Sequence, residues 1–154
     1  MADETEKDRI NRELIELLNE LRVALPGVQV LFAFLLILPF QQRFAETSVE
    51  DKAIYTVALL LSALAAALLI APSAYHRLNF RRDIKEGMLF DANKLIMAGL
   101  VCTAVGVACS IYLVVDVVYG GTPAVIATVA TVVVFGVLWL ALPLARRGEK
   151  EPGA

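Results

Sequence analysis

The sequence has little of what active-site chemistry commonly uses. Its 154 residues include one histidine, two cysteines and one tryptophan. A single histidine excludes a bis-histidine haem site within one chain, and the cysteines have no histidine partners with which to hold a metal. No glycine-rich phosphate loop, activated nucleophile or nucleic-acid motif occurs. We therefore expect no enzymatic activity, no cofactor, no metal and no nucleic-acid partner.

Charge is missing from four long stretches, Val23–Gln42, Ala53–Tyr75, Leu95–Val115 and Val117–Ala145. About 20 helical residues cross the roughly 30 Å hydrocarbon core of a membrane, and each stretch is at least that long. A soluble domain of this size could not bury four uniformly apolar helices, because a surface helix shows only an apolar stripe. The chain is 58% hydrophobic. These features predict an all-α, four-helix transmembrane bundle.

We expect the membrane domain to cover residues 26–145, with spans over about 26–41, 53–75, 95–118 and 123–145. In the turn between the last two spans, Thr122 is expected to cap the fourth span and Pro123 to open it. The charged tail, residues 146–154, ends in proline, glycine and alanine. It is expected to be disordered and cytoplasmic.

Residues 1–25 carry apolar side chains at helical spacing: Ile10, Leu14, Leu17, Leu18, Leu21 and Leu25. Pro26 and Gly27 interrupt the pattern, because proline removes a backbone donor and clashes with the preceding turn. The segment is therefore predicted to be a cytoplasmic amphipathic helix that lies on the membrane surface or against the bundle and bends into the first span. A docking helix for a partner protein fits the same pattern.

The basic residues indicate how the chain is oriented. Twelve of the 14 lysines and arginines fall in the N-terminal segment, the 76–94 loop and the tail, and only Arg43 and Lys52 lie on the other side. Cytoplasmic loops carry the excess of basic residues. We therefore expect a multi-pass protein of the cytoplasmic (inner) membrane with both termini in the cytoplasm.

Small residues line one face of the third span: Gly99, Cys102, Gly106 and Cys109. The two cysteines are two helical turns, or about 10 Å, apart, which is beyond the reach of a disulfide. Small residues let membrane helices approach closely, so this face is predicted to be a helix-packing seam. In the second span, Ala58, Ser62 and Ala66 repeat every four residues, as do Ala63, Ala67 and Ala71.

Polar groups inside a bilayer are the default functional candidates. Gln29 lies near the expected bend, where it could bond to a freed carbonyl, and Asp116 lies near the outer end of the third span with Arg43 as its expected ion partner. Alternatively, Gln29, Asp116 and Arg43 form a polar transport site. At the cytoplasmic interface we expect contacts with anionic lipid headgroups, or with a partner, from Tyr75, His76, Arg77, Arg81 and Arg82.

The order of several motifs resembles a family of small bacterial integral membrane proteins classed as a domain of unknown function. The motifs are Glu20–Val23, Leu25–Gln29, Phe34–Phe40, Pro72–Arg77 and Phe80–Arg82, and the likeness covers roughly residues 13–121. Some relatives have carried a sodium:proton antiporter label. The residues give that label little support, because no carboxylate lies at mid-membrane and antiporters are usually larger, with broken helices around a midplane site.

Two functional hypotheses follow. The first is a non-enzymatic accessory or regulatory membrane protein, in contact with the lipid bilayer and with a second copy or another membrane protein. The second is an oligomeric small cation or proton transporter or channel. A path lined by Gln29 and Asp116 would favour transport, whereas a bundle sealed by its small-residue seams would favour the accessory role.

Overall fold

The computed structural model describes residues 2–78 and 85–148, and every regular element in these two ranges is a helix. Four segments of the described chain are long and apolar enough to cross a membrane. They are Ile15–Phe40, Val49–Tyr75, Phe90–Tyr119 and Gly121–Ala145. The prediction of an all-α bundle with four membrane-length helices is confirmed.

The described chain consists mainly of long helices. The helices are α1 (Ala2–Ile37), α2 (Val49–Leu78), α3 (Lys85–Tyr119) and α4 (Gly121–Gly136), and α4 runs through the π-helical turn η3 (Val137–Ala141) into α5 (Leu142–Gly148). Two 3₁₀ turns, η1 (Leu38–Phe40) and η2 (Gln42–Glu46), link α1 to α2. Helix α5 therefore enters the expected tail, of which residues 149–154 lie outside the described residues.

The expected break at Pro26 is absent, because α1 continues through this residue. Leu21 and Val28 lie two helical turns apart on either side of Pro26, and both are buried against Ala65 and Leu69 of α2. Proline removes one backbone hydrogen bond, a loss that membrane helices tolerate. Residues on both sides of Pro26 thus pack as parts of one continuous helix, which corrects the expected interruption. The expected cytoplasmic surface helix over residues 1–25 stays a prediction.

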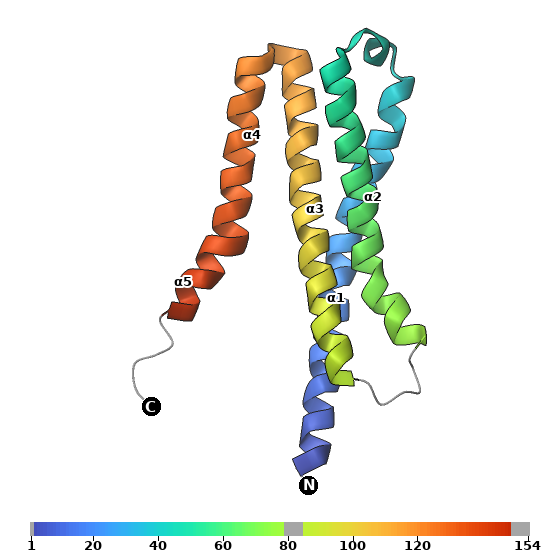
Figure 1. Cartoon of the computed structure of the whole chain (residues 1–154), viewed down its shortest axis with the longest axis vertical. Helices are drawn as coiled ribbons and strands as arrows, with labels where there is room; N and C mark the ends of the chain where they lie inside the picture. The colour runs from blue at the N-terminus through green and yellow to red at the C-terminus, as the bar shows by residue number, and fades with distance from the viewer. Residues whose placement is uncertain (1, 79–84, 149–154) are drawn as a thin grey trace.

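Helices α1, α2 and α3 form the core of the molecule, while α4 stands to one side against α3 (Figure 1). One buried cluster joins the three core helices through Leu21, Val28, Ala65 and Leu69, with Ile96 and Cys102 packed against it. A second cluster, nearer the α1–α2 turns, contains Leu35, Tyr55, Ala58 and Leu113. Helix α1 begins and α5 ends at the same end of the molecule, which an even number of crossings requires.

The turn between α3 and α4 differs from the expectation. Helix α4 begins at Gly121 with Gly120 as its N-cap, and no side chain caps it. Gly120 has a φ of 89°, a left-handed conformation that favours glycine. Because Gly120 makes the reversal alone, Thr122 is not needed as a cap, and Pro123 falls within the first helical turn, where no amide donor is required.

Candidate functional site

Among the described helices, the most extensive contact joins α2 and α3. A Cβ atom on Gly99 would lie 2.9 Å from Cγ of Leu69, and one on Gly106 would lie 3.1 Å from Oγ of Ser62. Both glycines therefore stand where a side chain would collide with α2. Cys102 and Cys109 are free and half-buried at the same contact, each against one of the two core clusters.

Five serine and threonine hydroxyls within the membrane-length helices are satisfied by their own helix. Ser62, Thr103 and Ser110 each donate a hydrogen bond to the carbonyl four residues earlier, at 2.8–2.9 Å. Thr128 and Thr131 of α4 do the same. The proton of each of these hydroxyls is therefore satisfied without a second helix.

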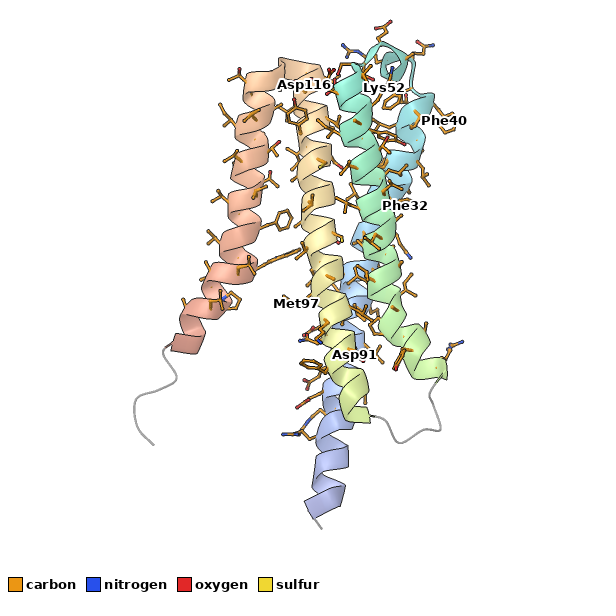
Figure 2. All side chains as sticks on the ribbon, in the orientation of Figure 1. Phe32, Phe40, Lys52, Asp91, Met97 and Asp116 are labelled. Carbon is orange, nitrogen blue, oxygen red and sulfur yellow. The ribbon has the colours of Figure 1, made fainter. Side chains whose placement is uncertain are left out.

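Among the described residues, no hydrogen bond or ion pair joins the three residues proposed for a polar site. Gln29 is exposed on α1, and its side chain makes no hydrogen bond to any described residue. Asp116 is half-buried at the end of α3 beside the turn (Figure 2), where its Oδ1 is 3.6 Å from the position of a Cβ on Gly121. Arg43 is exposed in η2, and no ion pair joins it to Asp116 within the described ranges.

At the opposite end, α2 and α3 enclose a small cavity of about 330 Å³ lined by Pro72, Tyr75, Asp91 and Lys94. Lys94 Nζ lies 4.2 Å from the centre of the Phe90 ring. Tyr75 and Arg77 are exposed here. Residues Arg81 and Arg82 and the side chain of His76 lie outside the described residues, so lipid contact by these five residues stays a prediction.

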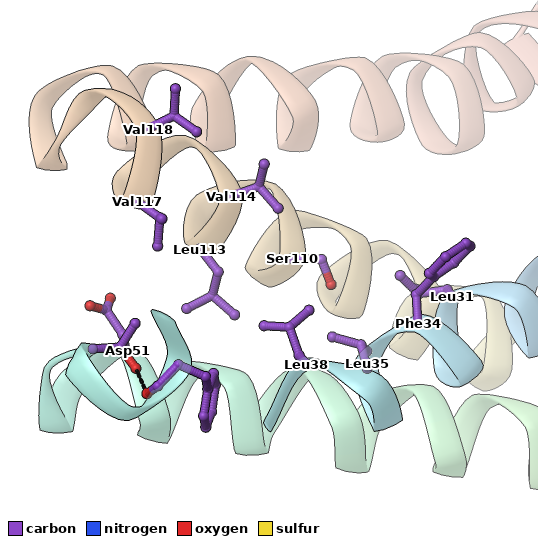
Figure 3. A pocket seen from close by; sticks show the side chains of 12 residues that line it. Leu31, Phe34, Leu35, Leu38, Asp51, Ser110, Leu113, Val114, Val117 and Val118 are labelled. Carbon is purple, nitrogen blue, oxygen red and sulfur yellow. Dashed lines mark hydrogen bonds between the residues drawn. The ribbon is translucent and has the colours of Figure 1, made fainter. Parts of the chain in front are cut away.

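An apolar cavity of about 320 Å³ lies where the α1–α2 turns meet the adjoining ends of α1 and α3 (Figure 3). Leu35, Leu38 and Leu113 line it, with Asp51 at its edge. The Asp51 carboxylate accepts a hydrogen bond from Ser48 at 2.8 Å, and the Asp51 amide donates to Oγ of Ser48 at 3.0 Å. Asp51 therefore serves a capping box at the start of α2.

The largest of these cavities is a groove between α3 and the chain from α4 to α5, with a volume of about 830 Å³. We call it the α3–α4 groove. Its walls include Met97, Val101 and Val105 of α3, Phe135 of α4, Trp139 of η3 and Pro143 of α5. Met97 lies on the side of α3 that faces this gap (Figure 2).

The α3–α4 groove forms because α4 diverges from α3 along its length, from the turn at Gly120 toward α5 (Figure 1). Proline at position 143 has no amide hydrogen for the carbonyl of Trp139, and its ring crowds that carbonyl. The helix widens into the π-helical turn η3 directly before Pro143. Such turns occur frequently at functional sites in helices.

Of the residues that the structure describes, Glu20 of α1 is the one charged residue that lines the α3–α4 groove. The sequence pattern did not single it out, because Glu13, Glu16 and Glu20 look like the solvated face of an amphipathic helix. Only the continuity of α1 and its packing beside α3 bring Glu20 to the groove. The one feature of the sequence that could have drawn attention to Glu20 is its position, within one helical turn of the first uncharged stretch.

Comparison with known proteins places the chain in one family. The model of a family of unknown function, DUF6328, matches residues 3–143, which include α1 almost entirely and α2, α3 and α4 in full. The chain belongs to this family. The resemblance noted in the sequence is thereby confirmed, and the DUF6328 match extends it at both ends. No curated protein and no solved structure matches the chain.

Proposed function

We propose that this member of DUF6328 is a non-enzymatic accessory or regulatory protein of the cytoplasmic membrane, with both ends in the cytoplasm, which receives an apolar guest in the α3–α4 groove. One observation carries the proposal, namely that an open apolar groove runs beside the contact between α3 and α4. Within the described chain, α3 is the only other membrane-length helix that α4 contacts.

The groove is open to the surrounding membrane. Val101 is 57% exposed on the α3 wall, and among the residues of α4, all of which the structure describes, only Ala124 is buried. Lipid tails are as apolar as these side chains, so a bound guest gains affinity from close packing and not from apolarity alone. A concave apolar site of this size is typical of small-molecule binding.

Two observations favour this role over the transporter alternative. Neither Gln29 nor Asp116 lines any of the three cavities described above. The hydroxyl protons of Ser62, Thr103 and Ser110 are donated to carbonyls of their own helices, so none of these three side chains offers a free donor to a file of water molecules.

Trp139 provides the test, because it lines the groove and is the only tryptophan. Purified protein in a non-ionic detergent is titrated with a phospholipid that carries brominated acyl chains, which quench tryptophan on contact. We expect quenching that saturates and is reversed by excess unbrominated lipid. Filling the groove with Val101→Phe should raise the half-saturating lipid concentration about tenfold, equivalent to about 1.4 kcal/mol of binding free energy.

The matched control is Val133→Phe. Val133 is 55% exposed, close to the value for Val101, but it does not line the groove. This variant should bind the brominated lipid like the unmodified protein. Quenching that rises without saturation, or that changes equally in the two variants, would refute lateral binding in the groove.

A further inference from the structure

We propose that the guest of the α3–α4 groove is a lipophilic monovalent cation, for which the carboxylate of Glu20 is the counter-charge. The inference rests on the proposed function, because it names the chemical class of the molecule that the groove receives. Three features carry it: the charge at the groove, the depth of that charge in the membrane, and the aromatic rings on the facing wall.

Among the described side chains, Glu20 is the single charged residue that lines the α3–α4 groove. It forms no ion pair or hydrogen bond with any described residue. Along α1, Glu13 is paired with Arg9 at 3.9 Å, and Arg22 lies about 200° around the helix from Glu20. A carboxylate without a partner beside a low-dielectric wall attracts a cation and repels an anion.

Glu20 lies at the depth where an amphiphilic cation would place its charge. The neighbouring Leu21 packs in the same cluster as Ile96, so Glu20 is level with the start of the apolar part of α3. The first uncharged stretch of the sequence begins three residues later, at Val23. A carboxylate at this interface keeps its contact with water at low cost, while the groove continues into hydrocarbon beside it.

Aromatic rings lie on the opposite wall of the groove. Phe135 and Trp139 pack edge to face, with ring centres 4.7 Å apart and planes at 65°. The face of an aromatic ring attracts a cation, and tryptophan does so best. The remaining walls are aliphatic and suit a bulky apolar body. An uncharged acyl chain would use the walls and leave the carboxylate unused.

The experiment compares two ions of the same shape and opposite charge. Tetraphenylphosphonium and tetraphenylborate are each tested for their ability to displace brominated lipid, measured as recovery of Trp139 fluorescence. We expect the phosphonium ion to displace the lipid at a concentration about tenfold lower than the borate ion, the order of effect that a cation–π contact and one charge pair supply together. Glu20→Gln removes the charge pair and should reduce this difference to the part that the cation–π contact supplies.

Glu16→Gln is the matched control, because Glu16 is an exposed glutamate one turn earlier that does not line the groove. It should keep the preference for the phosphonium ion. Equal displacement by the two ions in the unmodified protein, or equal loss of preference in both glutamate variants, would overturn the cation proposal while leaving the groove as a binding site. Failure of the proposed function itself would appear differently, as brominated lipid that never saturates.

Discussion

Where α1 ends, a single hydroxyl supplies a hydrogen-bond donor that the backbone lacks. Pro39 has no amide hydrogen, so the carbonyl of Leu35, four residues earlier, lacks its usual helical donor. The hydroxyl of Tyr55, on α2, donates to that carbonyl at 3.1 Å. Tyr55 is buried at 8% exposure, where an unpaired carbonyl or hydroxyl would be costly. The hydrogen bond from Tyr55 to Leu35 therefore links the end of α1 to α2.

Removing the hydroxyl should therefore weaken the protein measurably. Tyr55→Phe keeps the ring and its edge-to-face contact with Phe44, whose centre is 4.9 Å away, and deletes only the donor. We expect the free energy of unfolding to fall by about 0.5–1.5 kcal/mol. Denaturation with sodium dodecyl sulfate, followed by circular dichroism, measures it.

The second half of that test restores the missing amide. In a Pro39→Ala background residue 39 can donate to the Leu35 carbonyl, so Tyr55→Phe should cost clearly less than it does in the unmodified protein. An equal cost in both backgrounds would mean that the hydroxyl does not act through this carbonyl.

At the scale of the helices, the contact between α2 and α3 organises the bundle. It depends on the absence of side chains at Gly99 and Gly106, since Cβ atoms there would meet α2 at 2.9 Å and 3.1 Å. Membrane helices associate through packing of this kind because lipid offers them no hydrophobic drive. The capping box at Ser48 and the left-handed Gly120 then fix where α2 begins and α3 ends.

A methyl group placed in this contact should separate the helices. Gly99→Ala forces Leu69 and Leu68 to move, and we expect a loss of about 1–3 kcal/mol of stability, as for other overpacked sites. Gly27→Ala on α1 is the matched control, because a Cβ there meets nothing within 4 Å. Thermal unfolding in detergent, measured by circular dichroism, compares the two variants. A Gly99→Ala protein as stable as the Gly27→Ala protein would contradict the close approach.

For the whole molecule, sidedness follows from the placement of charge and the even number of membrane-length helices. We expect Thr122, in the turn between α3 and α4, to face the outside, and Gly148, at the end of α5, to face the cytoplasm. In a background with Cys102 and Cys109 changed to alanine, Thr122→Cys should react with a membrane-impermeant maleimide in intact cells. Gly148→Cys should react only after permeabilisation, and the reverse result would invert the topology.

The positions of the helices were easier to predict from the sequence than the way the helices pack together. Uncharged runs of 20 residues and more have one stable solution in a membrane, so the four crossings were predictable. The interruption expected at Pro26 was wrong. Local sterics predict that proline breaks a helix, but Leu21 and Val28 pack against α2 on both sides of Pro26 and α1 continues through it. The candidate site was less predictable still. Glu20 and Trp139 are far apart in the chain, and nothing in the sequence around either residue indicates that both line the same groove.

The lateral position of α4 also has a consequence for how the chain is made. Both buried clusters are built from α1, α2 and α3, and in the described chain neither contains a residue of α4. Synthesis proceeds from the N-terminus, so the three-helix core can close while α4 is still in the ribosome. Insertion of α4 then adds the second wall of the groove to a structure that is already folded. A chain truncated before Gly121 and released from the ribosome should assemble the core without the groove.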